Sequence, residues 1–177
     1  DFVKMGKIRY IGASAMYAWQ FVKANSIAEK NGWTKFISMQ DMYNLVYREE
    51  EKEMVKMCQY EGIAMTPFSP LAHGVFNKPV DADRTDGAGK LQSEYVINGD
   101  REIVKRVYEL ADKYRTSTSS IALAWVLSKP YMTSPIIGAS KKQYIDDALK
   151  AMEIKLNEEE IKYLEEPYLP HNQYGFR

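Results

Sequence analysis

The sequence predicts an α/β fold in which parallel strands alternate with helices. Short apolar runs typical of buried strands occupy residues 8–13, 36–40 and 63–68, and the segments between them have helical periodicity. These runs end about one strand–helix repeat apart, an order that predicts parallel strands joined by right-handed crossovers. A fourth run, residues 132–138, continues the pattern. We therefore expect four strands, at least four helices and no domain boundary within residues 1–177.

The first predicted helix begins after Met16, where the apolar period changes from a strand pattern to a helical one. Phe21, Ala24 and Ala28 fall on one face of this helix, and Gly32 is expected to end it.

A second helix is predicted over residues 48–60, with Gly62 as its stop. Met54 and Cys58 share its apolar side, which favours an inert core thiol over a nucleophile for Cys58. Carboxylates in the first turn of this helix and of the last helix suit the positive end of the helix dipole. They are Glu49, Glu50 and Glu51, and Glu158, Glu159 and Glu160.

Residues 69–100 form a long segment rich in Gly, Pro, Asp and Lys, without a sustained period. A loop of this length in a compact domain is typical of a binding loop or a disordered segment. Lys78, Arg84 and Lys90 fit either a loop that closes over a dinucleotide or a solvated loop.

The last part of the chain returns to helical patterns. Asp100 is a good N-cap for one helix, and the next, over residues 119–127, is apolar all round and should be buried. The final helix is expected to begin at the Asn157 cap, supported by Glu160, and to end at Pro167. The helix before it should direct four side chains inward: Ile145, Ala148, Leu149 and Met152.

Composition excludes several classes of partner. Lys and Arg together number 24, as do Asp and Glu, and this zero net charge argues against a nucleic-acid groove or a polybasic membrane surface. No apolar run is long enough to span a membrane. A single cysteine excludes an internal disulfide framework and favours a reducing compartment, so we expect a cytoplasmic protein. The chain opens without an initiator Met or an apolar leader, which suggests a processed or partly represented protein.

Ligands of parallel α/β folds gather at the carboxyl ends of the strands. These ends hold small residues, hydroxyls, the amide of Gln40 and the aromatic ring of Phe68. Residues 138–140 lead directly into a predicted helix N-terminus, which favours a bound phosphate. The residues alone leave two interpretations open, a nucleotide or phosphate site and ordinary tight turns.

Four motifs, in this order and spacing, resemble the aldo-keto reductase family. They are residues 6–14 (GKIRYIGAS), 39–45 (MQDMYNL), 68–72 (FSPLA) and 135–140 (PIIGAS). Residues 32–51 most resemble the fungal aryl-alcohol dehydrogenase-like branch. The resemblance implies a (β/α)8 TIM barrel, of which this chain is the carboxyl-terminal half: about the last four βα units plus terminal helices. Its length fits this, because a closed barrel needs roughly 250 residues.

The resemblance also implies a binding site for NADP(H). Ser14 and Gln40 match positions that hydrogen-bond the nicotinamide carboxamide, and Phe68 matches the aromatic residue that stacks on the nicotinamide. Matches to the pyrophosphate contacts are Ser69, Pro70, Leu71 and Ala72. Matches on the adenosine side are Gly138, Ser140, Tyr144 and Asp147.

Some positions depart from the family pattern. Ala15 stands where many members carry Asn or Arg, Tyr144 where many carry Arg, and His73 where Arg, Gly or Cys is common. A preference for NADP over NAD then depends on Ser140 and a neighbouring lysine, Lys141 or Lys142. His73 itself fits either a phosphate contact or a surface loop.

No segment matches the family's catalytic Tyr, Lys, Asp and His, which come from the first four strands, so no catalytic residue is assigned. His73 and His171 are too distant in sequence to suggest a metal site, and His171 should be exposed to solvent. We expect an NADP-dependent reductase or dehydrogenase that acts on a small carbonyl or alcohol. The alternative is a non-catalytic half-barrel that binds nucleotide or self-associates through its open strand edges.

Overall fold

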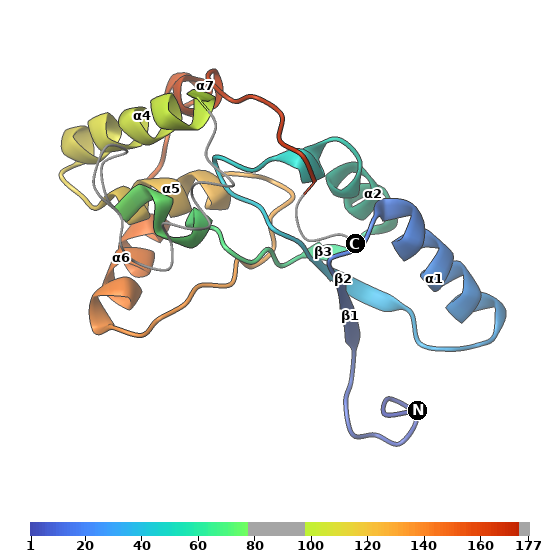
Figure 1. Ribbon diagram of the computed structural model, residues 1–177. Helices are drawn as coiled ribbons and strands as arrows, with labels where there is room; N and C mark the ends of the chain where they lie inside the picture. Colours follow the sequence, from blue (N-terminus) through green and yellow to red (C-terminus); the bar gives the residue numbers. More distant parts are fainter. Residues whose placement is uncertain (78–97, 174–177) are drawn as a thin grey trace.

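The computed structural model describes residues 1–77 and 98–173. Its centre is a three-stranded parallel sheet in the order β1 (Ile11–Ser14), β2 (Phe36–Gln40) and β3 (Ala64–Met65) (Figure 1). The parallel α/β class predicted from the sequence is therefore confirmed. The second strand has the predicted bounds; the first is displaced toward the carboxyl end of its run, and the third is shorter than predicted. An isolated parallel bridge between Met42 and Phe68 continues the pairing beyond β3.

The predicted fourth strand, residues 132–138, is not a strand. A single parallel bridge joins Met65 to Met132, and the segment then donates hydrogen bonds to the carbonyls of Met65 and Pro67. Pro135 lacks an N–H, and so does Pro67 on the facing segment, so neither can donate to a regular ladder. The segment follows the sheet without forming a strand.

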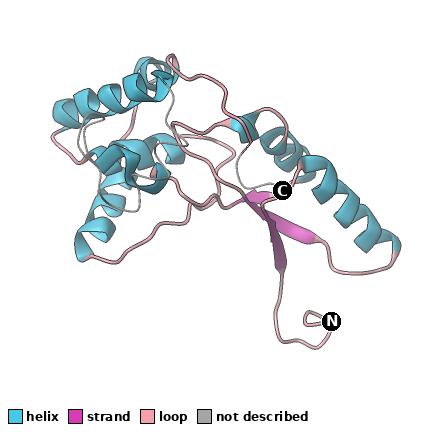
Figure 2. Cartoon of the chain, in the orientation of Figure 1, coloured by secondary structure: helices cyan, strands magenta, loops and turns pink. Residues whose placement is uncertain are grey.

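The helices lie in two groups (Figure 2). Beside the sheet are α1 (Ala18–Lys30), the 3₁₀ turn η1 (Glu49–Glu51) and α2 (Met54–Glu61). Farther along the chain are η2 (Ala72–Asn77), α4 (Asn98–Tyr114), α5 (Thr118–Leu127), α6 (Lys142–Glu153) and α7 (Glu158–Glu165). Gly62 is left-handed after α2, and Asn157 and Glu160 form a capping box on α7, as predicted. The predicted N-cap Asp100 is wrong, because α4 already begins at Asn98 and Asp100 lies within its first turn. The helix predicted over residues 48–60 is divided into η1 and α2. Of the predicted loop 69–100, residues 78–97, with Lys78, Arg84 and Lys90, lie outside the described residues.

The main core lies between the second group of helices and residues 42–47, which follow β2. α5 packs against η2, α4 and α6, and its residues from Ser120 to Val126 are buried on every side, as the sequence predicts. Trp125 is the largest fully buried side chain of the described residues and stacks on Tyr43. A smaller core, with Phe21, Met39 and Cys58 at its centre, joins α1 and α2 to the sheet.

Two sequence predictions of burial are wrong. On α6, Ile145, Leu149 and Met152 are exposed, because the helix packs against α5 through Ala151 and the half-buried Ala148. His171 is not solvent-exposed: its side chain is buried, and its Nε2 lies 3.1 Å from Asp100 Oδ1. Among the described residues, none of the helices has the length and apolar character needed to cross a membrane.

Candidate functional site

A cavity of about 400 Å³ is lined by residues of η2, α5, the N-terminal part of α6 and the segments that follow β3 and precede α6. Six of the predicted cofactor-binding residues line it: Ser69, Pro70, Leu71, Gly138, Tyr144 and Asp147. The rest of the lining adds polar groups from Asn77 and Ser119 and the side chain of His73. The structure thus brings residues from two distant motifs to one hollow.

The backbone on one side of this cavity is strained. Ser69, Ala72 and His73 have φ angles of 51°, 49° and 52°, in the left-handed region that L-residues rarely adopt. Such residues cost about 1–3 kcal/mol each and tend to cluster at ligand sites. Asn44 stabilises this turn, because its side-chain amide donates to the Ser69 carbonyl at 3.0 Å.

Ser69 and His73 face each other across this turn. Ser69 Oγ lies 3.1 Å from Nε2 of His73 and 3.4 Å from its Nδ1. Partial burial lowers the pKa of His73, which favours the neutral imidazole near pH 7. When Ser69 and His73 hydrogen-bond each other, one N–H or O–H donor of the pair stays free for an anionic oxygen.

The opposite side of the cavity is formed by the loop that leads into α6. Lys141 is the N-cap of α6, in an extended conformation, and its side chain makes no capping hydrogen bond. Backbone N–H groups at such an end are suited to an anion. Gly138 has open space around it, since an added Cβ would meet no heavy atom within 4 Å. Ser140, by contrast, is exposed and outside the cavity lining.

Ser14 and Gln40 meet at the ends of β1 and β2. They are paired in the strand register, and Ser14 Oγ donates to the Gln40 carbonyl at 2.8 Å. Ala15 follows with a φ of 49°, and its N–H points to both the Gln40 carbonyl and Asp41 Oδ1. A second strained turn therefore lies at the carboxyl edge of the same sheet.

Phe68 and Ala72 are less available than the other predicted residues. The Phe68 N–H donates to the Asp41 carbonyl at 3.0 Å, and its half-buried ring packs against the main core. Ala72 is fully buried, and its N–H donates to the Ser69 carbonyl. Of these two, only the partly exposed ring of Phe68 offers a surface to a ligand.

The chemistry of these groups fits a dinucleotide phosphate. The cavity provides a hydroxyl, an imidazole, a carboxamide and a helix N-terminus for anionic oxygens, and the phenol of Tyr144 and the carboxylate of Asp147 for a nucleoside. The described residues hold no cluster of three or more metal-ligating side chains.

Sequence reasoning missed a polar network around Tyr43. Tyr43 donates to Glu51 Oε1 at 2.5 Å and lies 2.7 Å from the Tyr131 hydroxyl, and Arg48 binds the same carboxylate. Burial, then the nearby Glu51 charge, raises the pKa of Tyr43 far above its usual value, so this phenol is no candidate proton donor. The one feature of the sequence that could have indicated this network is the run of three adjacent acids, Glu49, Glu50 and Glu51. Two of them are buried in the folded chain instead of facing solvent in a first helical turn.

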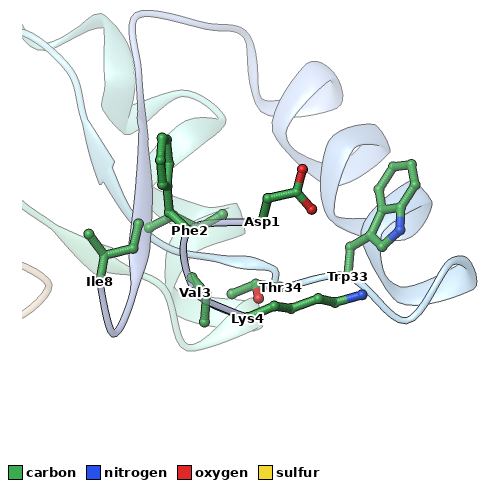
Figure 3. Close-up of a pocket in the computed structure, with 8 residues that line it drawn as sticks. Asp1, Phe2, Val3, Lys4, Ile8, Trp33 and Thr34 are labelled. Atoms are coloured by element: carbon green, nitrogen blue, oxygen red, sulfur yellow. The ribbon is translucent and has the colours of Figure 1, made fainter. Parts of the chain in front are cut away.

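A second cavity, of about 430 Å³, lies at the opposite end of the sheet (Figure 3). It is formed by the first residues of the chain together with Ile8, Trp33 and Thr34. This is the amino end of β1, whereas ligands of parallel sheets collect at the carboxyl ends. The cavity therefore does not contribute to the candidate site.

Comparisons with known proteins identify the family of the chain. The profile of the aldo/keto reductase family matches residues 1–168. An aryl-alcohol dehydrogenase-type protein of Schizosaccharomyces pombe is 48% identical over 174 residues, which are 96% of this chain and 49% of that protein. The versiconal hemiacetal acetate reductase of Aspergillus parasiticus is 46% identical over 96% of this chain and 51% of its own length. The chain spans about half the length of these relatives.

Proposed function

The chain belongs to the aldo/keto reductase family, and from this premise we propose that it supplies the cofactor-binding part of an NADP(H)-dependent oxidoreductase. The whole enzyme would transfer a hydride between the nicotinamide and a small carbonyl or alcohol. Aryl alcohols are the substrate class that the names of similar fungal proteins favour. The observation that carries this proposal is the gathering of Ser69, Gly138, Tyr144 and Asp147 around one cavity at the strand ends.

The proposal gives each group a task. The Ser69 hydroxyl, His73 and the N-terminus of α6 would hold the phosphates, and Tyr144 and Asp147 would contact the adenosine. Ser14 and Gln40 would fix the orientation of the nicotinamide, which presents one face to the substrate. When bound, NADP(H) supplies or accepts the hydride, and the chain holds it in place.

The test is a fluorescence titration of the chain with NADPH. Gly138→Leu should weaken binding at least tenfold, because the open space at this position lets a larger side chain occupy the cavity without displacing the backbone. Ala139→Leu is the matched control: it adds the same bulk to the next residue, which is exposed and outside the lining. Equal affinity for both variants would overturn the site.

The preference for NADPH over NADH is tested at Ser140. Ser140→Ala should weaken NADPH binding and leave NADH binding unchanged, since the lost hydroxyl would contact only the 2′-phosphate. A parallel loss for both cofactors would reject this assignment and leave the choice of cofactor to Lys141 or Lys142.

Catalytic groups are expected in the part of the relatives that this chain does not span. Reading the coding sequence upstream of Asp1 tests this, and strand ends carrying Asp, Tyr, Lys and His are the expected result. An upstream sequence without them would favour the second candidate, a non-catalytic module.

The second candidate is a half-barrel that self-associates. One edge of β1 pairs with β2, and no strand of the described residues pairs with its other edge. Exposed apolar side chains lie nearby on the first residues and on β2: Phe2, Met5, Ile8, Tyr10 and Ile37. Light scattering tests it, and a monodisperse monomer would count against self-association.

A further inference from the structure

Two acidic side chains are buried together beside the turn that follows β1. Asp41 comes directly after β2 and is 1% exposed, and Glu50 in η1 is 4% exposed. Their carboxyl groups interact directly with each other. Asp41 Oδ2 and Glu50 Oε1 are buried without a hydrogen-bond partner among the described residues. Two ionised carboxylates in this position would repel each other, and neither would carry a donor for a hydrogen bond between them.

The surroundings of the pair disfavour two negative charges. Burial, followed by the Asp41 charge, raises the pKa of Glu50 to about 8. Burial also raises the pKa of Asp41 to about 6, although its hydrogen bonds lower it in part. The titratable neighbours are the Glu49 carboxylate, which is paired with Lys52, and the Cys58 thiol of α2. Neither supplies a positive charge, and no Lys or Arg of the described residues forms an ion pair with Asp41 or Glu50.

Asp41 also holds the strained turn at the end of β1. Its Oδ1 accepts a hydrogen bond from the Ala15 N–H at 3.1 Å. Ala15 is left-handed, a conformation that needs such external support. Ser14 immediately precedes it. The carboxyl group of Asp41 therefore connects Glu50 to the segment that carries Ser14.

We propose that Asp41 and Glu50 share one proton, and that this pair positions the Ser14–Ala15 turn for nicotinamide binding. The cofactor role rests on the proposed function, whereas the shared proton does not. With the proton in place, Glu50 donates to Asp41 and leaves Asp41 Oδ1 directed at the Ala15 N–H. Loss of the proton leaves two adjacent buried charges, which repel each other and release the turn. Both residues are positioning residues, since neither lines the cavity.

Hydrogen exchange at the amide of Ala15 tests the shared proton without any cofactor. Protection should fall about tenfold between pH 6 and pH 9 in the natural chain, once corrected for the exchange rate of an unstructured peptide. A group with a pKa near 8 loses about nine-tenths of its protons by pH 9. In Glu50→Gln the protection of the amide should stay at its pH 6 value up to pH 9, because the glutamine amide can donate to Asp41 at every pH. Glu53→Gln, an exposed neighbour, should behave like the natural chain.

Urea unfolding provides a second readout. A carboxyl group whose folded pKa is raised binds more protons folded than unfolded, so its stability is present at low pH and lost as pH rises through about 8. The urea midpoint should fall from pH 5 to pH 8 in the natural chain and fall less in Glu50→Gln. Equal slopes in the two proteins, or unchanged protection at Ala15, would overturn the shared proton. If adding Mg²⁺ or Ca²⁺ at pH 9 raised the urea midpoint back to its pH 5 value, the shared proton would also be overturned. A cation bound between the two carboxylates would then be the better account.

NADPH titration then tests the positioning role. Affinity should fall with rising pH more steeply in the natural chain than in Glu50→Gln, with Glu53→Gln again as the control. Equal pH dependence in all three proteins would overturn positioning even if the proton is shared. Absence of NADPH binding at every pH would overturn the proposed function and, with it, the cofactor role of the pair.

Discussion

Trp125 of α5 is completely buried, whereas Trp19 of α1 and Trp33, just after that helix, are 58% and 56% exposed. The contrast extends to the regions around them. The largest core joins η2, α4, α5 and α7 to residues 42–47, while the segment that includes β1, β2 and α1 has a small core and many exposed apolar side chains. A helix satisfies its own backbone hydrogen bonds, whereas the edge strand of an open sheet leaves backbone N–H and C=O groups unpaired. The helical region therefore buries its apolar side chains more completely than the region around β1.

The largest expected effect is the loss of Trp125. Its ring stacks on Tyr43 at 5.4 Å, its Nε1–H donates to Glu165 at 2.8 Å, and Lys129 lies over it at 4.5 Å. Trp125→Ala should lower the free energy of unfolding by about 3–5 kcal/mol, the usual cost of emptying a large aromatic site in a core. Urea unfolding followed by circular dichroism measures this change.

Trp19→Ala is the matched control in the other region. It removes the same side chain from an exposed position and should cost under about 1 kcal/mol, because much of the ring already contacts water. Similar losses for the two variants would remove the distinction between the regions.

The next effect concerns the start of α7. Glu160 accepts hydrogen bonds from Lys113 Nζ and Tyr114 Oη, both at 2.7 Å, and from the Asn157 N–H at 2.9 Å. Glu160→Gln should cost about 2 kcal/mol, since it removes a charge from hydrogen bonds that join α7 to α4. Glu158→Gln, an exposed first-turn control, should cost under about 0.5 kcal/mol.

The cost at Glu160 should depend on pH. Burial raises the pKa of this carboxyl, but hydrogen bonds from Lys113, Asn157 and Tyr114 outweigh burial and lower it overall. An acid with a lowered folded pKa stabilises the protein above its unfolded value and loses that contribution as pH falls. The difference between the natural chain and Glu160→Gln should therefore shrink below pH 4.5. A difference that stays constant down to pH 3 would contradict this account.

Local signals in the sequence predicted most of the helix boundaries. Gly62 stops α2 in a left-handed conformation, and Asn157 with Glu160 caps α7, because each of these devices needs only residues a few positions apart. The apolar stripe of α6 led to a wrong prediction of burial. Periodicity shows that a helix is amphipathic, but it does not show what covers the apolar face. The prediction of a fourth strand was wrong although the sequence shows Pro135, a residue that lacks the N–H needed for regular strand pairing.

The candidate site was predictable where motifs mark it and not where distant residues meet. Motif matching selected Ser69, Gly138, Tyr144 and Asp147, which the fold brings to one cavity. It gave no sign that His171 would reach Asp100, 71 positions away, or that Glu50 would meet Asp41. Such pairs depend on the path of the whole chain, and no short spacing in the sequence records them.

The smallest effect on stability, and the sharpest test of the exposed region, is Ile37→Thr on β2. Ile37 is exposed, and Thr keeps a β-branched side chain suited to a strand, so the free energy of unfolding should change by less than about 0.5 kcal/mol. Self-association should nevertheless weaken, if the uncovered sheet brings copies together. Analytical ultracentrifugation over a range of concentrations measures this. Leu149→Gln, on the exposed face of α6, is the control, because it removes apolar surface from the helical region. Weaker association in Leu149→Gln alone would place the self-association surface on α6. The helical region, and not the sheet, would then be the part that brings copies together.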